Sequence, residues 1–561
     1  MPESAPMYAS GGQEVTAMPE ETNTTPSSAD PEKASKKRKK KQQKARGVWI
    51  SFGGRIVAQV VGAAATIFLG ILLVQKGYGP SPDNTGAKDA PPPVVRETAS
   101  QKSGHISVAV LPLDNFSPDP NKEYFADGMT EALIAGLAQF DGLRVISRTS
   151  VMQFKRQSKS VPEIAQQLAV DMIVEGSVIQ ADDRVRVTAQ LVNGKTDEHL
   201  WAETFDRPLR NILTLQSEIA TTIAKKINTA LTPPTNTTRT EQKTVDPDVY
   251  DLYLKGRHAW STRTRKGLEQ AVPELEAVVK LDPNFAPAYA ALGDTYSHMG
   301  FSAFGMLSPN DAFTKAKASA QRAVQLDDNL SEAHTALGLI QMRYAWDWAG
   351  ANRSFTRALQ LNPSYETARQ WYALYLSEQG RDSEAQDEAK RLVEIDPLSS
   401  TTHRIVGSIH YYGRRYDLSE QSLRRAVELE PGSVATQIVL SRPLISLGKF
   451  REVIDLLEKV PQGERPDELI CMLGYAYART GDRRRADELR RQLENRRPPA
   501  APGSLVRLYI GLGDTNAAFN ALDAAIRDRS DVVSVLKVSP LFDDLRRDPR
   551  FSQVLRKANL S

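Results

Sequence analysis

A repeating register of helix-ending residues constrains this chain more than any other feature. The positions are Pro283, Asp328, Pro363, Pro397 and Pro431, and successive members lie 45, 35, 34 and 34 residues apart. Each follows an apolar run with helical spacing, such as RALQLNP or RLVEIDP. Proline ends such a helix because it lacks a backbone N–H and clashes with the preceding turn. A period near 34 residues that holds two helices predicts an α-solenoid, an architecture that presents an extended protein-binding surface.

Small residues recur at fixed distances from these five anchors. Two antiparallel helices approach closely only where the facing side chains are small, so each unit needs such positions. Ten residues after the anchors stand Gly293, Gly338, Ala373, Gly407 and Ser441, and twelve residues before them stand Ala271, Ala316, Ala351, Ala385 and Ser419.

This pattern resembles the tetratricopeptide repeat. The matching positions are Tyr289, Leu292, Gly293 and Tyr296 in a first helix, and Ala351, Phe355, Ala358 and Pro363 in a second helix. Weaker units extend the array in both directions, so we expect a solenoid over residues 247–530 and a capping segment over 531–561. Asp328 replaces a proline, and residues 301–311 lengthen one loop between helices.

The N-terminal region predicts a membrane anchor. Residues 1–47 form a polar, basic tail without a core, and residues 48–75 contain the uncharged apolar run 56–74. Nineteen helical residues span about 28 Å, close to the hydrocarbon thickness of a bilayer. Nine Lys and Arg residues lie between Lys33 and Arg46, whereas Lys76 is the one such residue in the ten that follow Val74. Positive charges stay inside, so we expect a single-pass bacterial inner-membrane protein with a cytoplasmic N-terminus and a periplasmic body.

Two other interpretations of this region are weaker. A cleaved signal peptide fits poorly because the apolar run is long, lies far from Met1 and lacks a small-residue cleavage site. The basic run also has the composition of a nucleic-acid patch, but beside an apolar span it is better explained as an orientation signal. The chain carries a net charge of +4, most of it in the tail, so we expect no nucleic-acid partner.

A second folded domain is predicted between a Pro/Gly linker (76–104) and another linker (233–246). Residues 105–232 contain a buried strand at 106–113, a helix at 122–140, a capping box from Ser160 to Glu163 and a hairpin that turns at Asp182-Asp183. A last strand and a closing helix at 212–231 complete a β-α-β-α-β-β-β-α order. The sequence therefore predicts an α+β multidomain protein: one transmembrane helix, a compact α/β domain and an all-α tetratricopeptide-type solenoid.

The α/β segment resembles the TolB amino-terminal-like domain, related to the FlgO-type domain. The resemblance rests on AVLPLDNFSPDPNKEYFADGMTEALIAGLAQFDGLRVISRTS, IVEGSV, RVRVTAQLV and HLWAETFDR, and it covers residues 106–231. It implies a bacterial envelope or signalling protein, because this domain recurs beside tetratricopeptide arrays there. Relatives often carry a transcriptional, kinase or cyclase domain ahead of the membrane span. Residues 1–47 show no such domain, so an output activity is not carried over.

No motif for catalysis, a cofactor or a metal stands out. The chain lacks a phosphate-binding glycine loop, a zinc-protease motif and paired CXXC motifs. Cys471 is the single cysteine and sits in an apolar helix, so we interpret it as a buried hydrophobe. His334 and His403 occupy positions where the repeat needs a bulky residue. We therefore predict no enzymatic activity, no cofactor and no metal site.

The predicted function is binding of a protein or peptide partner in the periplasm by the concave face of the solenoid. Tyr411 near Arg404 and Arg442 has the composition of an interaction hot spot. The alternative is an envelope sensor or regulatory receptor whose α/β domain binds a ligand and signals through a cytoplasmic partner. The candidate protein-binding residues are Thr335, Met342, Gln370, Arg404, Ser408, Tyr411, Arg442, Tyr475 and Arg479.

Overall fold

The computed structural model describes residues 105–228, 244–301, 306–497 and 500–560 of the 561-residue chain. These residues belong to one compact unit that covers residues 101–561. The predicted tail, transmembrane helix and Pro/Gly linker (1–104) lie outside the described residues, as does most of the linker 233–246. Within the described ranges, no helix is both long and apolar enough to span a bilayer.

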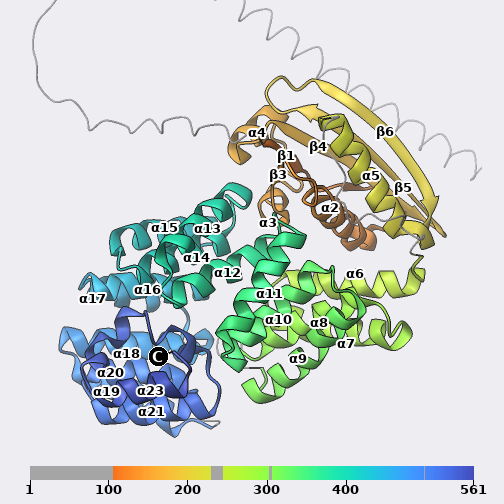
Figure 1. The fold of residues 1–561 in the computed structure, drawn as a ribbon. Helices are drawn as coiled ribbons and strands as arrows, with labels where there is room; N and C mark the ends of the chain where they lie inside the picture. Colours follow the sequence, from red (N-terminus) through yellow and green to blue (C-terminus); the bar gives the residue numbers. More distant parts are fainter. Residues whose placement is uncertain (1–104, 229–243, 302–305, 498–499, 561) are drawn as a thin grey trace, which may run out of the picture. The chain divides into compact units, whose positions relative to one another are not determined.

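The first part of the described chain is a small sheet domain (Figure 1). Its strands are β1 (Ile106–Val110), β2 (Asp114–Asn115), β3 (Leu143–Val145), β4 (Met172–Ala181), β5 (Arg184–Asn193) and β6 (His199–Pro208). Its α-helices are α2 (Glu123–Leu137), α3 (Arg148–Met152), α4 (Val161–Leu168) and α5 (Ile212–Ile227). Two short 3₁₀ turns, η1 (Pro120–Lys122) and η2 (Leu209–Asn211), precede α2 and α5.

The sheet is mixed, with the order β3-β1-β4-β5-β6, and β2 extends the pairing of β4. β1 pairs in parallel with β3 and β4, and its residues Val108, Ala109 and Val110 are fully buried, as expected of a strand covered on both faces. β4, β5 and β6 form an antiparallel meander. The predicted hairpin is confirmed: β4 and β5 meet at Asp182, whose φ is 52°.

Local sequence signals explain the helices of this domain. The backbone N–H of Ser160 donates to a carboxylate oxygen of Glu163 at 2.9 Å, which is the predicted capping box at the start of α4. Apolar residues at helical spacing on α2 and α5 form the core with β1 and β4, and Phe125, Met129 and Leu133 are at most 2% exposed.

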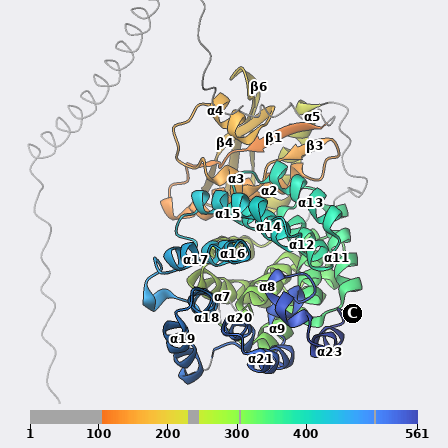
Figure 2. The same ribbon diagram turned by 90° about the vertical axis from the view of Figure 1, so that its left-hand side faces the viewer.

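The remainder is helical and forms eight consecutive helix pairs within the described residues (Figures 1 and 2). The first helices of units one to eight are α6 (Pro247–Ser261), α8 (Ala286–Met299), α10 (Ser331–Ile340), α12 (Glu366–Glu378), α14 (Ser400–Tyr412), α16 (Val434–Ser446), α18 (Asp467–Thr480) and α20 (Pro502–Leu512). The second helices are α7 (Arg265–Leu281), α9 (Pro309–Leu326), α11 (Trp348–Leu361), α13 (Asp382–Ile395), α15 (Tyr416–Leu429), α17 (Phe450–Leu457), α19 (Arg483–Asn495) and α21 (Thr515–Arg527). A sheet domain followed by a tetratricopeptide-like solenoid is therefore confirmed.

The small residues lie where the two helices of a unit touch. All five positions twelve residues before the anchors are fully buried: Ala271, Ala316, Ala351, Ala385 and Ser419. A Cβ atom added to Gly407 on α14 would stand 2.5 Å from Cγ of Leu423 on α15. A side chain at position 407 would therefore force these two helices apart.

A side chain six residues after the anchor binds the anchor's carbonyl oxygen in four successive units. His334 contacts the carbonyl of Asp328 at 2.9 Å, and His403 contacts that of Pro397 at 2.9 Å. Arg369 donates to the carbonyl of Pro363, and Gln437 donates to that of Pro431 at 3.3 Å. Three different residue types thus tie each first helix to the turn before it. The two histidines are structural, as their repeat positions suggest.

One extra residue in unit three is absorbed by a π-turn. The interval from Asp328 to Pro363 is 35 residues, whereas the next two are 34. The extra residue falls in η3 (Gln341–Ala345), a π-helical turn that continues α10, and the N–H of Trp346 bonds to the carbonyl of Gln341 five residues back. Trp346 then takes a left-handed conformation with φ 53°. This turn determines where Arg343 and Trp346 point.

The chain ends in short elements that follow α21. They are η5 (Asp531–Val535), η6 (Pro540–Phe542), α22 (Asp543–Arg546) and α23 (Arg550–Lys557), and a short 3₁₀ turn, η4 (Gln462–Glu464), lies between α17 and α18. α23 contacts α21, whereas η5 contacts η3 of unit three. The chain therefore returns from the last unit to the middle of the array.

His403→Ala should loosen the start of α14, because it removes the hydrogen bond to Pro397. A net loss of about 1 kcal/mol corresponds to roughly fivefold faster amide hydrogen exchange in residues 398–408 of the full-length chain. His403→Gln is the matched control and should leave exchange unchanged, because Gln437 makes the same contact in the next unit. Equal loosening by both substitutions would show that imidazole packing, and not the hydrogen bond, supports this turn.

Candidate protein-binding groove

The first helices of the eight units form one continuous row. Each contacts the first helix of the next unit, from α6 to α8 through α18 to α20. All nine candidate residues lie on this row: Thr335 on α10, Met342 on η3, Gln370 on α12, Arg404, Ser408 and Tyr411 on α14, Arg442 on α16, and Tyr475 and Arg479 on α18. We call the surface of these helices that faces away from the second helices the inner face.

The structure buries most of the nine. Met342 and Tyr411 are 0% and 1% exposed, so a partner does not reach them in this conformation, and a hot spot centred on Tyr411 stays a prediction. Thr335, Gln370, Ser408 and Tyr475 are also buried. Arg404 and Arg442 are partly exposed and Arg479 is exposed. The reason is tertiary: neighbouring first helices and the C-terminal segment cover positions that a single helix would leave open.

Charged pairs run along the inner face. Arg343 on η3 donates two hydrogen bonds to the carboxylate of Glu378 on α12, at 3.0 and 2.9 Å. Further along, Arg442 on α16 donates to Glu468 on α18 at 2.9 Å, and Arg507 on α20 lies 3.4 Å from the same carboxylate. Burial raises the pKa of Glu378. At Glu468, burial opposes ionisation but Arg507 and Arg442 outweigh it and lower the pKa.

Arg404 differs from these arginines because the largest charge effect on it is repulsive. Burial lowers the pKa of Arg404, and the positive charge of Arg442 lowers it further; Glu430 raises it by a smaller amount, and Arg263 has a still smaller lowering effect. A carboxylate that came close to Arg404 would stabilise its charge.

Units one to three enclose little empty space. Side chains of Tyr253, Arg257, Asp294, Glu332 and Tyr365 converge here and leave a cavity of about 10 Å³. This volume holds roughly one water molecule, whereas small-molecule pockets occupy about 300–1,000 Å³. This end of the inner face is thus closed by its own side chains and does not offer a small-molecule pocket.

The carboxyl group of Glu366, at the start of α12, borders this closed end. Burial, followed by the nearby charge of Asp396, raises its pKa to about 7. Asp396 is itself fully buried at the end of α13. Glu366 therefore titrates near neutral pH, unlike an exposed glutamate.

Asp396 joins the sheet domain to unit four. Its carboxylate accepts hydrogen bonds from the hydroxyls of Thr402 at 2.6 Å and Ser150 at 2.8 Å, and from Ser147. In addition, the N–H of Ser147 donates to the carbonyl of Ile395 at 2.7 Å. Without the sheet domain, this buried carboxylate would lose two of its three hydroxyl partners.

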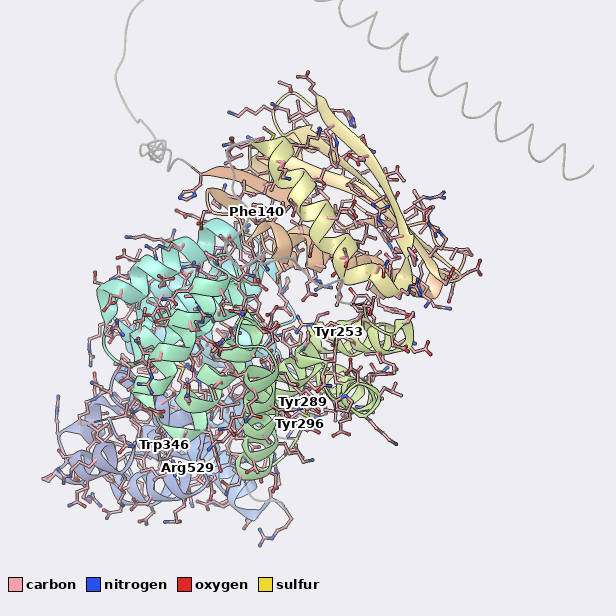
Figure 3. The ribbon with its side chains drawn as sticks, turned by 45° about the vertical axis from the view of Figure 1, so that its right-hand side comes forward. Phe140, Tyr253, Tyr289, Tyr296, Trp346 and Arg529 are labelled. Carbon is pink, nitrogen blue, oxygen red and sulfur yellow. The ribbon has the colours of Figure 1, made fainter. Side chains whose placement is uncertain are left out.

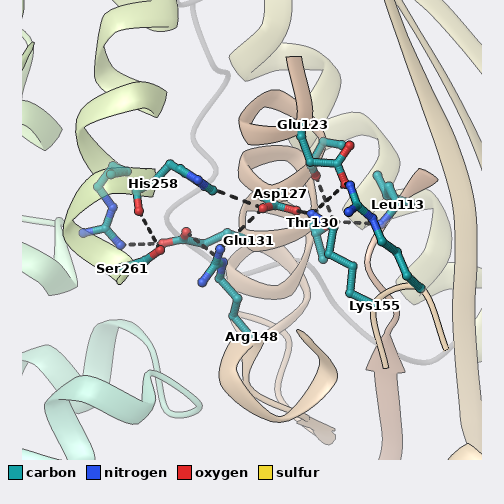
Figure 4. Close-up of polar contacts among 12 residues, drawn as sticks. Leu113, Glu123, Asp127, Thr130, Glu131, Arg148, Lys155, His258 and Ser261 are labelled. Atoms are coloured by element: carbon teal, nitrogen blue, oxygen red, sulfur yellow. Dashed lines mark hydrogen bonds and ion pairs between the residues drawn. The ribbon is translucent and has the colours of Figure 1, made fainter. Parts of the chain in front are cut away.

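A second joint connects α2 of the sheet domain to α6 of unit one (Figure 4). Arg257 on α6 donates to the carboxylate of Glu131, and Nδ1 of His258 lies 3.6 Å from Oδ2 of Asp127. Tyr124 donates to Asp251 at 2.6 Å, and Lys122 donates to the same carboxylate at 3.0 Å. The sheet domain therefore bridges units one and four of the solenoid.

Sequence reasoning missed both joints and the C-terminal return. Asp396 stands at a repeat position shared with Asp282, so its sequence context does not distinguish it from an ordinary turn residue. For Arg343 a signal existed, namely the 35-residue interval that marks one extra residue in its unit. Cys471 is buried as expected, and burial raises the pKa of its thiol. The described residues contain no cluster of three or more metal-ligating side chains.

In a comparison with protein families, part of the chain matches the second domain of HilA/YgeH-like transcriptional regulators. It covers residues 103–222, which is the sheet domain and part of α5. The match is to a single domain and does not assign the whole chain to a family. The TolB amino-terminal-like identification of the same segment stays a prediction.

Two curated bacterial proteins are similar to parts of this chain. A protein named putative adenylate cyclase 3, from Rhizobium meliloti, is 35% identical over 249 residues, and the match covers 44% of this chain and 42% of that protein. The chain thus spans about two fifths of that relative's length. The transcriptional regulator HilA of Salmonella typhimurium is 25% identical over 435 residues, 76% of this chain and 75% of that protein.

Among solved structures, the chain is similar to PilF of Pseudomonas aeruginosa. The sequence identity is 18%, the match covers 41% of this chain and 98% of that chain, and the TM-score is 0.30. The assignment of the solenoid therefore rests on its own helix register and burial.

Glu366→Gln should stabilise the protein more at pH 8 than at pH 4. As pH rises from about 4.5 to 7, the unfolded state loses the Glu366 proton before the folded state does, so the wild-type side chain destabilises the fold increasingly across this window. The gain at pH 8 should be on the order of 1–3 kcal/mol and the gain at pH 4 near zero, measured as the shift in Tm of the full-length chain. Glu269→Gln, at an exposed position on α7, is the control. An equal shift at both pH values would contradict the raised pKa.

Proposed function

We propose that this protein is a membrane-anchored scaffold that binds a protein or peptide partner along the inner face of its solenoid. Its N-terminal tail lies in the cytoplasm, one helix crosses the inner membrane, and the sheet domain and solenoid lie in the periplasm. The membrane part is supported by the uncharged run 56–74 and the basic residues before it.

The observation that carries partner binding is the continuous row of eight first helices, which offers an extended surface. Arg404 lies on α14 in this row, is partly exposed and is repelled by Arg442. Arg479, two units further on, is exposed and lies over the rings of Phe450 and Tyr475, with 5.8 and 5.9 Å to the ring centroids. These arginines suit a partner segment that carries carboxylates and an aromatic or apolar residue between them.

The partner that we propose for the inner face is a macromolecular segment. The cavity where units one to three meet the start of unit four holds about one water molecule, so a small ligand has no enclosed volume at that place. A row of first helices instead offers an extended surface, on which a chain segment makes contacts with several units.

A second candidate is a sensor or regulatory receptor, with the sheet domain as the part that detects a signal. It is favoured by the two curated relatives, because a region similar to this chain occurs in a protein named as a transcriptional regulator and in one named as a putative adenylate cyclase. Similarity to two proteins with different named activities fits a regulatory role of the similar region better than a catalytic one. The TolB amino-terminal-like identification of residues 105–232 supports the same candidate.

Photo-crosslinkers placed at Arg404 and Arg479 should capture the partner in living cells. A crosslinker at Arg425, which is exposed on the second helix α15, is the control and should give no adduct with the same protein. With the captured protein purified, Arg404→Ala should weaken its binding by about tenfold, or 1.4 kcal/mol. Adducts at all three positions would contradict binding on the inner face.

The topology follows from the charge asymmetry around residues 56–74. An alkaline phosphatase fused after Ser561 should be active, and protease added to spheroplasts should digest the sheet domain and solenoid while sparing the tail. Exchanging the basic tail residues for Gln should reduce the correctly oriented fraction. Full protection of the C-terminal region would place the body in the cytoplasm.

A further inference from the structure

The C-terminal segment, residues 531–548, lies on the inner face. η5 contacts η3 of unit three and α20 of unit eight, and η6 contacts α16 and α20. Of these partners, α16 and α20 are first helices and η3 continues the first helix α10, whereas η5 also contacts the second helix α21. The segment therefore crosses from the last unit to the middle of the solenoid along the surface that the candidate residues line.

Polar contacts hold this segment at three places. Arg343 donates to the hydroxyl of Ser534, and Arg414 donates to both carboxylate oxygens of Asp543, at 2.6 and 2.9 Å. Just before the segment, Arg529 donates to the carbonyl of Tyr344 at 3.3 Å and stacks over Trp346, 4.1 Å from the ring centroid (Figure 3). The π-turn of unit three supplies both Arg343 and the chain reversal at Trp346.

Apolar side chains of the segment fill the space between the first helices. Leu536, Leu541 and Phe542 are 0%, 7% and 1% exposed, and they share a core with Tyr411 and Leu444. This arrangement has the features of a bound peptide: buried apolar anchors, a serine at one end and a carboxylate at the other. It also explains why Tyr411 is buried.

The arginines of the inner face that bind the segment still have hydrogen-bond partners if the segment leaves. Arg343 keeps its two hydrogen bonds to Glu378, and Arg414 is 52% exposed, so water replaces Asp543. The joint at Asp396 is different, because there a buried carboxylate would lose two hydroxyl partners. The segment itself consists of two 3₁₀ turns and a four-residue helix.

We propose that residues 531–548 are an internal ligand of the inner face. When they leave, the surface formed by Arg343, Tyr411 and Arg414 binds a partner segment of the same chemistry, apolar and aromatic with a carboxylate next to the aromatic residue. This proposal deepens the proposed function and rests on it. In the closed state the segment covers inner-face surface of units three, six and eight.

The test uses a fluorescent peptide of residues 529–548 and the full-length chain, with binding measured by anisotropy. Asp543→Arg places a positive charge against Arg414 and should release the chain's own segment. This variant should bind the peptide at least tenfold more tightly than wild type. The matched control is Asp523→Arg, which breaks the Asp523–Lys557 pair between α21 and α23. The two pairs are almost equally exposed, at 43% and 53% for the control and 41% and 52% for Asp543–Arg414.

Reversing both charges should restore closure. In the double variant Arg414→Asp with Asp543→Arg, hydrogen exchange over residues 531–548 should return toward the wild-type rate, because the opposite charges face each other again. Equal peptide binding by wild type, Asp543→Arg and Asp523→Arg would overturn the proposal, because it would show adhesion that is unrelated to the inner face.

Hydrogen exchange over residues 531–548 reports release directly. If Asp543→Arg leaves exchange unchanged, Phe542→Asp provides a stronger disruption of the same segment. Should neither variant raise exchange there, or should a released variant fail to bind the peptide, the segment is a fixed cap and the proposal is wrong. That result would say nothing against partner crosslinks formed at Arg404. The two experiments therefore distinguish a failure of the internal-ligand proposal from a failure of the proposed partner binding.

Discussion

The close approach of two helices at small residues is the constraint on which the solenoid depends. Gly407 faces Cγ of Leu423 at a distance that leaves no room for a side chain, and Ala271, Ala316, Ala351, Ala385 and Ser419 are fully buried at the corresponding contact. Because each unit packs in this way, the first helices of consecutive units meet in one row. In units three to six, a hydrogen bond from the sixth residue after the anchor also ties the first helix to the preceding turn.

Two long-range bridges make this array unlike a simple solenoid, in which a unit contacts only its neighbours. The sheet domain connects unit one to unit four through Arg257 and Asp396, and the C-terminal segment connects unit three to unit eight through Arg343 and Ser534. Distant units are therefore coupled, and the two bridges overlap at units three and four. A partner that displaced either bridge would change the freedom of several units together. This gives the array a physical route to regulation that stacked repeats alone lack.

Much of the fold was predictable because it depends on local signals. The strands of the sheet domain, the capping box at Ser160 and the hairpin at Asp182 follow from alternation, turn chemistry and strand composition. The order of the strands in the sheet was not predicted. The candidate site was predictable only in part. All nine candidate residues lie on first helices, yet Met342 and Tyr411 are core residues. The periodicity of the sequence shows which side of a first helix lies on the inner face. It does not show which other segment of the chain covers that side.

The sequence alone determined the period, the two-helix unit, the small contact positions and the division into a sheet domain and a solenoid. These features depend on residues a few turns apart, whose spacing is visible in the chain. Only the tertiary structure showed that Asp396 binds Ser147 and Ser150, that Arg343 reaches Ser534 and that the C-terminal segment covers the inner face. Those contacts join residues 191 to 249 positions apart. Which residues meet at such separations depends on the summed rotation of all the units that lie between them. No local sequence pattern encodes this summed rotation.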